Sequence, residues 1–193
     1  IYFVVALLLL LQIFSFAQKK PAYKPAIVAC DCRFRVDSSY IATAPIALQA
    51  DSVFPNRIDT SFKTQCGYLL VPENRKKASS RMIRLPFIIV KSKNADRKKD
   101  PVLFTSGGPG NSSLGWAQAI TRSTWINDRD CIAFEQRGTR YAIPYLRNFE
   151  LDIAIREAYR KNLSKDSMTI VGLKRYKKKL LDKGIDLAGY TSD

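Results

Sequence analysis

Hydrophobic and polar residues alternate in short segments from residue 66 onward, and this pattern predicts a sheet. Cys66 to Pro72 reads as a short strand that the proline stops. From Met82 to Lys91 the apolar residues occupy every second position, at Ile83, Leu85, Phe87 and Ile89. Two such segments joined by a basic turn that begins at Glu73 are typical of a β-hairpin.

A continuous apolar segment, Val102 to Thr105, follows the hairpin and leads into a glycine-rich loop. Its lack of alternation predicts burial on both faces, as in a parallel sheet. Ser113 to Ser123 is compatible with a helix, and Cys131 to Phe134 is a further apolar strand. Strand, loop, helix and strand in this order form a βαβ unit, for which a right-handed crossover is expected. The predicted fold class is therefore α/β.

Two helices are predicted after this unit, over Leu151 to Leu163 and over Ser167 to Lys183. Three residues of the second helix share one face at helical spacing, namely Leu173, Tyr176 and Leu180. Gly184 offers a C-terminal stop for that helix, because glycine adopts the left-handed conformation at helix ends without penalty.

The beginning of the chain is typical of a secretory signal. Ile1 to Ala17 carries no charge and includes an unbroken leucine run. Small residues at Ser15 and Ala17 predict cleavage after Ala17. The alternative is a retained membrane anchor, since about 17 apolar residues is the lower limit for spanning a bilayer. We predict a signal segment over residues 1–17, an irregular extension over 18–60, an incomplete α/β domain over 61–193, and a secreted, periplasmic or cell-envelope location.

Export makes disulfides possible, and the chain has four cysteines. Cys131 lies in an apolar segment, where a free cysteine behaves as a small hydrophobic residue. The remaining three predict one bridge to Cys66 from either Cys30 or Cys32. A metal site is the alternative, but Cys-x-Cys without histidine lacks the usual zinc spacing, so we expect no metal.

The formal net charge of +15 makes nucleic-acid binding a legitimate hypothesis. Two basic clusters, 75–77 and 97–99, fall in predicted turns, and a third, 174–179, lies on a helix without interleaved aromatic residues. Solvated surface therefore explains the charge better, and we expect no nucleic-acid partner. The same charge would attract anionic polymers of the cell envelope.

The loop from Ser106 to Ser112 is the candidate chemical site, because its glycines leave backbone N–H groups free to bind developing negative charge. The chain contains no histidine and no Gly-x-Ser-x-Gly elbow, since Gly110 to Gly115 has the wrong spacing. Ser112 and Ser113 are expected to be loop residues or a helix cap. Without a histidine base, neither serine is activated by the usual route.

With these residues in view, the chain resembles the N-terminal part of an α/β-hydrolase of the prolyl iminopeptidase and tripeptidyl aminopeptidase family of exported serine peptidases. Four motifs in the family's order carry the resemblance. They are Cys66-Gly67-Tyr68-Leu69-Leu70-Val71-Pro72, Ser106-Gly107-Gly108-Pro109-Gly110-Asn111-Ser112, Arg129-Asp130-Cys131-Ile132-Ala133-Phe134-Glu135-Gln136-Arg137-Gly138-Thr139 and Gly184-Ile185-Asp186-Leu187-Ala188-Gly189-Tyr190-Thr191.

The resemblance implies that the glycine loop follows the third strand and that Gly108, supported by Gly107, supplies an oxyanion-hole N–H. A glycine turn that only redirects the chain is the alternative. Glu135 and Arg137 would brace the active-site loops through charge-assisted hydrogen bonds, the alternative being a plain surface ion pair. The family implies a peptide substrate and no cofactor.

Three residues depart from the family pattern. Ser106 stands where prolyl iminopeptidases usually have histidine, Glu135 replaces aspartate, and Arg140 replaces glycine. If that glycine position requires a left-handed backbone, arginine there costs about 1 kcal/mol or more.

The resemblance places the serine elbow, the acid and the histidine after Asp193, so we expect an N-terminal fragment that is inactive alone. The strand at Val102 to Thr105 would be left as an unpaired apolar edge, which predicts poor solubility. Another hydrolase on the same scaffold, such as an esterase or epoxide hydrolase, is the alternative enzyme, since fold does not fix substrate. A non-catalytic basic protein that binds the cell envelope is the alternative outside enzymes.

Overall fold

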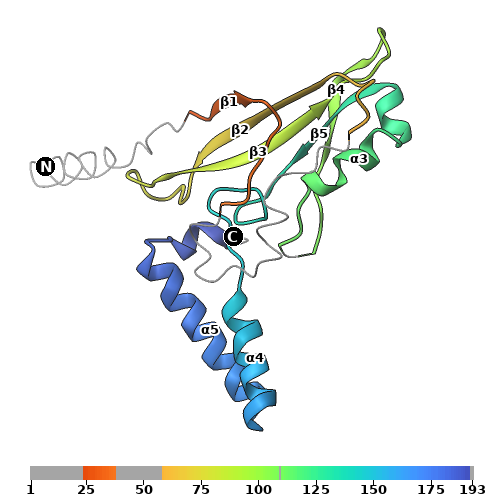
Figure 1. The fold of residues 1–193 in the computed structure, drawn as a ribbon. Helices are drawn as coiled ribbons and strands as arrows, with labels where there is room; N and C mark the ends of the chain where they lie inside the picture. Colours follow the sequence, from red (N-terminus) through yellow and green to blue (C-terminus); the bar gives the residue numbers. More distant parts are fainter. Residues whose placement is uncertain (1–23, 38–57, 109, 192–193) are drawn as a thin grey trace, which may run out of the picture.

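The computed structural model describes residues 24–37, 58–108 and 110–191 and has a mixed α/β fold built on one five-stranded sheet (Figure 1). The strands are β1 (Ala26–Cys30), β2 (Thr64–Pro72), β3 (Met82–Val90), β4 (Lys98–Phe104) and β5 (Arg129–Phe134). The described α-helices are α3 (Ala117–Ile120), α4 (Phe149–Lys161) and α5 (Lys165–Asp182). Short 3₁₀ helices are η2 (Leu114–Trp116), η3 (Thr124–Asn127) and η4 (Leu187–Tyr190).

The strand order in the sheet is β1-β2-β3-β5-β4. β2 and β3 form the predicted antiparallel hairpin, with Leu69 opposite Leu85, and β3 also pairs antiparallel with β5. β4 pairs parallel with β5 on one side, and η2, α3 and η3 connect the two strands. The predicted βαβ unit is therefore present, with β4 at one edge of the sheet.

The N-terminal region contains a strand that the sequence did not predict. β1 pairs antiparallel with β2, so the expectation of an irregular extension over 18–60 is wrong for Ala26–Cys30. This strand lies at the other edge of the sheet and is largely exposed, which explains why its sequence shows little alternation. The predicted signal segment, residues 1–17, lies outside the described residues.

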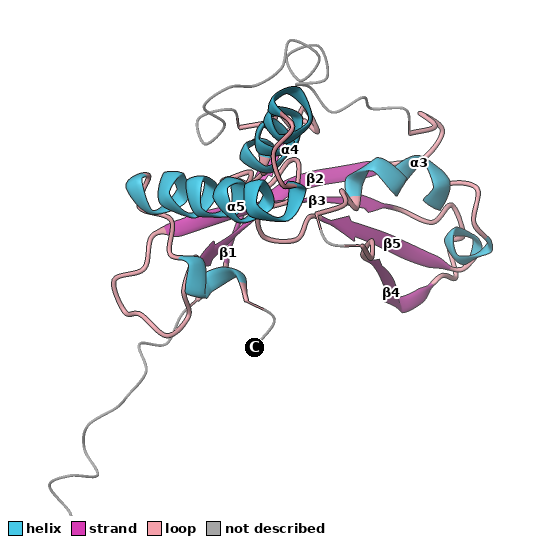
Figure 2. Ribbon diagram, turned by 90° about the horizontal axis from the view of Figure 1, so that it is seen from below, coloured by secondary structure: helices cyan, strands magenta, loops and turns pink. Residues whose placement is uncertain are grey.

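One face of the sheet is packed and forms the main core. Ile88 and Ala133 are fully buried there and belong to one core cluster with Phe34 and with Ala117 and Ile120 of α3. Figure 2 shows α3 beside the strands of the sheet. We call this the covered face. It also holds Cys66 and Cys131.

The opposite face of the sheet is apolar and forms a shallow groove of about 360 Å³, which we call the open face. Leu103 of β4 is 61% exposed there, whereas Val102 and Phe104 turn toward the covered face. The prediction that Val102 to Thr105 is buried on both faces is therefore wrong, because β4 is an edge strand with one packed side. The residues that line the open face are Ile27, Leu69, Leu85, Phe87, Ile89, Leu103, Ile132 and Phe134.

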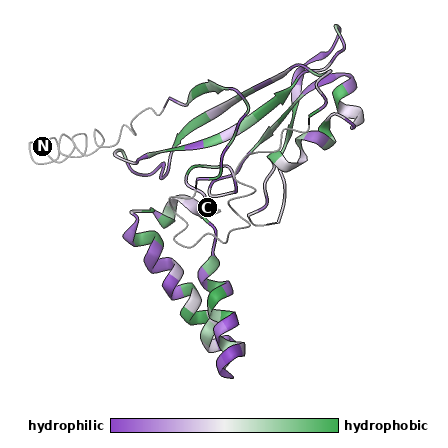
Figure 3. Cartoon of the chain, in the orientation of Figure 1, coloured by the Kyte–Doolittle hydropathy of each residue, from purple (hydrophilic) through white to green (hydrophobic). Residues whose placement is uncertain are grey.

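Helices α4 and α5 pack against each other as an antiparallel hairpin that extends away from the sheet (Figure 1). Gly172 permits their close approach, because a Cβ there would lie 2.9 Å from the Cβ of Ala154. Leu180 is buried but Leu173 is 47% exposed, so the predicted common face holds only in part. Gly184 ends α5 with φ of 68°, as expected. The hairpin carries hydrophilic and hydrophobic residues side by side (Figure 3).

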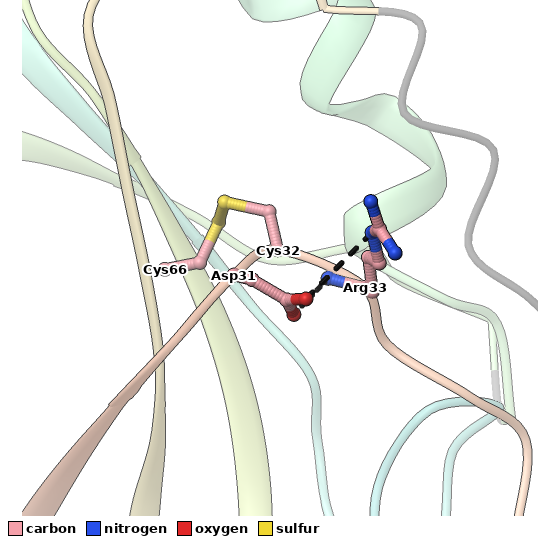
Figure 4. Close-up of a disulfide and its surroundings, with 4 residues drawn as sticks. All are labelled: Asp31, Cys32, Arg33 and Cys66. Atoms are coloured by element: carbon pink, nitrogen blue, oxygen red, sulfur yellow. Dashed lines mark hydrogen bonds and ion pairs between the residues drawn. A yellow bond between two sulfur atoms is a disulfide. The ribbon is translucent and has the colours of Figure 1, made fainter.

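One disulfide joins the segment after β1 to β2. Cys32 and Cys66 are bonded, with their Cα atoms 5.1 Å apart, which selects one of the two predicted pairings (Figure 4). Cys131 is free and only 1% exposed, as expected for a central strand. Cys30 is also free. No helix within the described ranges combines the length and the apolar character needed to cross a bilayer.

Candidate functional site around the glycine-rich loop

The glycine-rich loop begins where β4 ends and is held in a tight turn by its own asparagine. The Asn111 N–H donates to the carbonyl oxygen of Gly108 at 3.1 Å, and the Asn111 side-chain amide donates to that of Gly107 at 3.1 Å. Gly108 has φ of 77°, and a Cβ there would lie 2.7 Å from the Asn111 side-chain nitrogen. Glycine is thus required at Gly108 by both backbone conformation and space.

The N–H group of Gly108 is available to an anion. Within residues 24–37, 58–108 and 110–191, it donates to no acceptor, although the carbonyl of the same residue is engaged by Asn111. A fixed, unused N–H at the end of a parallel strand is suited to stabilising developing negative charge. The loop geometry is thus compatible with the oxyanion role that the resemblance implies for Gly108.

Glu135 is fully buried and holds the C-terminal end of the glycine loop through hydrogen bonds. Its carboxylate accepts hydrogen bonds from the hydroxyls of Ser112 and Thr139 and, at 3.2 Å, from the N–H of Leu114. Burial raises the pKa of Glu135, and the bonds from Ser112 and Thr139 oppose that rise. The alternative of a surface ion pair is wrong for Glu135, because the side chain is inaccessible to solvent.

The two serines of the loop have structural contacts. Ser112 accepts from the N–H of Gly115 at 3.3 Å, as a helix cap does, in addition to its bond to Glu135. Ser113 is fully buried and accepts from the N–H of Ser106 at 3.0 Å. These contacts agree with the expectation that both are loop or cap residues, and they place the capping bond on Ser112.

Arg137 ties the loop after β5 to the end of β2. Its guanidinium donates to the carbonyl oxygens of Pro72 at 2.9 Å and Glu73 at 2.8 Å. Arg140 does not occupy the left-handed region, since among described residues other than glycine only Cys32 and Asn162 have positive φ. Arginine at position 140 therefore carries no left-handed strain.

Gln136 is a member of the site that sequence reasoning missed. Its side-chain amide donates to the Thr105 hydroxyl at 2.9 Å and to the Ser106 carbonyl oxygen at 3.3 Å. It thereby fixes the point at which β4 turns into the glycine loop. Its place between Glu135 and Arg137 in the third motif was the available signal.

A second missed cluster joins η4 to the β2–β3 hairpin. Glu73 is 2% exposed and accepts from Arg81 at 2.5 Å and from the Tyr190 hydroxyl at 2.9 Å. Burial, and then the bond to Glu73, raise the pKa of Tyr190. Gly189 lets η4 approach, because a Cβ there would lie 2.0 Å from the Glu73 carbonyl oxygen.

These segments border an open surface hollow of about 770 Å³ beside the glycine loop. Apolar side chains of Leu85 and Phe134 line it, and both also line the open face, so the hollow and the open face adjoin. The other lining residues come from three of the four sequence motifs and from the basic turn, and include Arg75, Gly107, Gly108, Arg137, Tyr190 and Thr191. Residues up to 116 positions apart in the sequence thus meet at one site, as Arg75 and Thr191 do.

No model of a known protein family matches this chain, and a search of curated proteins finds no relative. Functional assignment therefore depends on the geometry of the glycine loop and its surroundings. Among the described side chains, no group of three from His, Cys, Asp and Glu lies close enough together to hold a metal ion.

Proposed function

We propose that this chain is the N-terminal part of an exported serine hydrolase of the α/β-hydrolase fold, acting as an aminopeptidase of the prolyl or tripeptidyl type. The observation that carries the proposal is the loop at Gly107 and Gly108. It follows a parallel strand, presents an N–H at Gly108 that donates to no acceptor among the described residues, and adjoins a hollow large enough for part of a peptide.

The topology of the sheet supports the hydrolase fold. In that fold, the strand before the oxyanion loop is the third, and it lies between the fold's own fourth and fifth strands. β4 of this chain would correspond to that third strand. Here β4 pairs with β5 on one side, and no described strand pairs with its other side. The antiparallel β2–β3 hairpin precedes this parallel pair, in the order that the resemblance implies.

In the proposed mechanism, this chain stabilises the negative charge that develops on the substrate. When a nucleophilic serine attacks a scissile carbonyl, the carbonyl oxygen becomes an oxyanion, and the Gly108 N–H donates to it. Glu135, Gln136 and Asn111 are positioning residues, because each fixes a different part of the loop. The serine, its histidine base and the orienting aspartate would come from sequence beyond Asp193. No cofactor is required.

The reading frame after the codon of Asp193 is the first test. We expect Gly-x-Ser-x-Gly, then aspartate, then histidine, and we expect the complete product to hydrolyse aminoacyl p-nitroanilides. A frame that ends without the elbow serine would overturn the proposal. Hydrolysis of esters or epoxides but not of peptides would assign the same scaffold to the alternative substrate class.

In the complete enzyme, Gly108 and Gly107 form a matched pair for testing the oxyanion role. Gly108→Ala must shift its left-handed backbone and Asn111, whereas a Cβ at Gly107 meets nothing within 4 Å. We expect Gly108→Ala to lower kcat by about 10²-fold or more, the usual loss for an oxyanion donor. Gly107→Ala should retain most of kcat. Equal kcat values in the two variants would remove Gly108 from the mechanism.

A second candidate function is non-catalytic binding of anionic cell-envelope polymers, and one observation favours it. A hollow of about 800 Å³ at the opposite end of the sheet is lined by Lys63, Lys91, Lys93 and Arg97. Asp130 pairs with Lys91 and Arg97, and Lys93 donates to the Ser61 hydroxyl at 2.7 Å, so two of these four cations are already engaged by a carboxylate. Salt-sensitive binding to polyphosphate, lost in Lys63→Gln with Lys93→Gln, together with a reading frame lacking the elbow, would favour this function.

A further inference from the structure

Three of the four cysteines meet at one place on the covered face. Cys30 is the residue directly opposite Cys66 in the antiparallel pairing of β1 and β2, and Cys32 is bonded to Cys66. Directly opposite residues in such a pair point to the same face of the sheet. Accordingly, Cys30 and Cys32 both pack against the core cluster that contains Cys66.

The register makes Cys30 a geometrically suitable partner for Cys66. Opposite residues of an antiparallel pair have Cα atoms about 4.5–5.5 Å apart, within the range of about 4.4–6.8 Å that a disulfide spans. Cys32 lies two residues beyond this pair along the chain. It reaches Cys66 because the chain turns at Cys32, where φ is 63°. Figure 4 shows this turn, closed by the Arg33 N–H donating to Asp31 at 3.1 Å.

The two possible bridges close loops of nearly the same length. Cys32 and Cys66 are 34 residues apart, and Cys30 adds two residues to that separation. Loop-closure entropy changes only with the logarithm of loop length, so it barely distinguishes the two bridges. The left-handed backbone at Cys32 disfavours the observed Cys32–Cys66 bridge. The packing of the fully buried Phe34, two residues further along the chain, favours that bridge.

We propose that Cys30, Cys32 and Cys66 form a thiol–disulfide exchange site in which Cys66 is bonded to Cys32 or to Cys30. The Cys30 thiolate attacks Sγ of Cys66, the Cys30–Cys66 bond forms, and the Cys66–Cys32 bond breaks with its electron pair left on Cys32. The proton lost by Cys30 is taken up at Cys32. One thiol and one disulfide are present before and after, so the step needs no oxidant or reductant.

The site is accessible to thiol reagents in a way that Cys131 is not. Cys30 and Cys32 are each partly exposed, whereas Cys131 is 1% exposed within β5. Exchange would release the chain at Cys32 and would attach it two residues earlier, which changes the anchoring of Phe34 and Val36 in the core. The exchange involves β1, the segment that follows it and β2, and it does not depend on the proposed hydrolase function.

Alkylation of the whole chain tests the proposal. The protein is incubated with iodoacetamide at pH 8 and digested with a protease that cleaves before aspartate, because cleavage at Asp31 separates Cys30 from Cys32. We expect the label on Cys32 as well as on Cys30, with the matching Cys30–Cys66 peptide found by mass spectrometry. Cys30→Ser is the matched control, in which Cys32 should stay unlabelled because the remaining thiol, Cys131, is buried within β5.

Cys32→Ser keeps the test decisive if exchange is slow. In a glutathione buffer that oxidises the parent bridge, this variant should form Cys30–Cys66, and Cys131 should remain a free thiol. Label on Cys30 alone in the parent protein, after incubation for several days, would overturn the proposal. Equal label on Cys32 in the parent and in Cys30→Ser would overturn it as well, because it would reveal incomplete oxidation.

Discussion

The two faces of the sheet are made by the same strands yet have opposite environments. On β3, Ile88 is fully buried on the covered face, and its neighbour Ile89 lines the open face. On β4, Phe104 packs toward the core and forms a tilted ring contact with Trp116, while Leu103 is 61% exposed. Consecutive residues of a strand, which point to opposite faces, thus have similar hydrophobicity and very different burial.

This difference shows that the strands carry the composition of a sheet that is covered on both sides. Strands with one solvated face normally alternate apolar and polar residues, whereas strands buried on both faces are continuously apolar. Eight apolar side chains line the open face, and they adjoin the hollow of the glycine loop. Contiguous apolar surface of this kind marks a contact area, which is compatible with the proposal that further sequence of a hydrolase packs there.

The adjacent isoleucines of β3 give the strongest test of the difference in burial between the covered face and the open face. Ile88→Ala should lower the free energy of unfolding by about 2–5 kcal/mol, since it leaves a cavity in a fully buried site. Ile89→Ala should cost about 1 kcal/mol, because the side chain already contacts solvent. Urea denaturation with an unchanged m value measures both. Equal losses would show that a cover protects the open face in solution.

Gly67 tests whether the open face is packed locally. A Cβ at this position would lie 2.7 Å from the Phe87 ring and 2.8 Å from the Val28 carbonyl oxygen. Because backbone cannot move as a flexible side chain does, Gly67→Ala should cost about 1–3 kcal/mol. Gly115→Ala is the control, since a Cβ there would approach only the Ser112 hydroxyl, at 4.0 Å. A neutral Gly67→Ala would mean that β1 is not held against β2 as described.

Glu135, at the junction of the core and the glycine loop, gives a pH-dependent prediction. Burial raises its pKa above the ordinary value of 4.5, so the fold favours the neutral carboxyl. The stability it contributes is present below pH 4.5 and declines as pH rises through the raised pKa. Glu135→Gln should remove that decline, so the difference between parent and variant should shift in favour of the variant as pH rises.

Thermal unfolding of the Glu135 pair between pH 4 and pH 8 measures the effect, which should be on the order of 1 kcal/mol, the net value of a typical hydrogen bond. Glu157→Gln on α4 is the control, because ion pairs with Lys161 and Arg175 lower the pKa of Glu157 instead. A parent protein whose stability relative to Glu135→Gln rises with pH would contradict a raised pKa.

The sequence was sufficient to predict the hairpin, the βαβ unit, both long helices and the stop at Gly184, because each has a local periodic or turn signal. β1 was missed because an exposed edge strand has no burial pattern to reveal it. The sequence motifs pointed to Gly108, Glu135 and Arg137, which lie in or beside the glycine loop, and their roles stay predictions. The contacts of Gln136 and of the Glu73–Tyr190 pair depend on segments far apart in the chain, so only the folded structure could reveal them.

A substitution on the edge strand β4 should have the smallest effect on stability and the clearest effect on association between chains. Leu103 is 61% exposed on β4, where the free strand edge and the apolar side chain together offer a pairing surface to other chains. Leu103→Lys should change the free energy of unfolding by no more than about 0.5 kcal/mol, as surface substitutions usually do. It should nevertheless increase the monomer fraction measured by light scattering.

A second edge variant separates the open face from the strand edge as the cause of association. Ile27 lies on the open face at the opposite edge of the sheet, on β1, and is 70% exposed. If the free edge of β4 drives association, Ile27→Lys should leave the monomer fraction unchanged while Leu103→Lys raises it. If both variants raise it equally, the apolar open face itself, rather than pairing at the edge of β4, drives association.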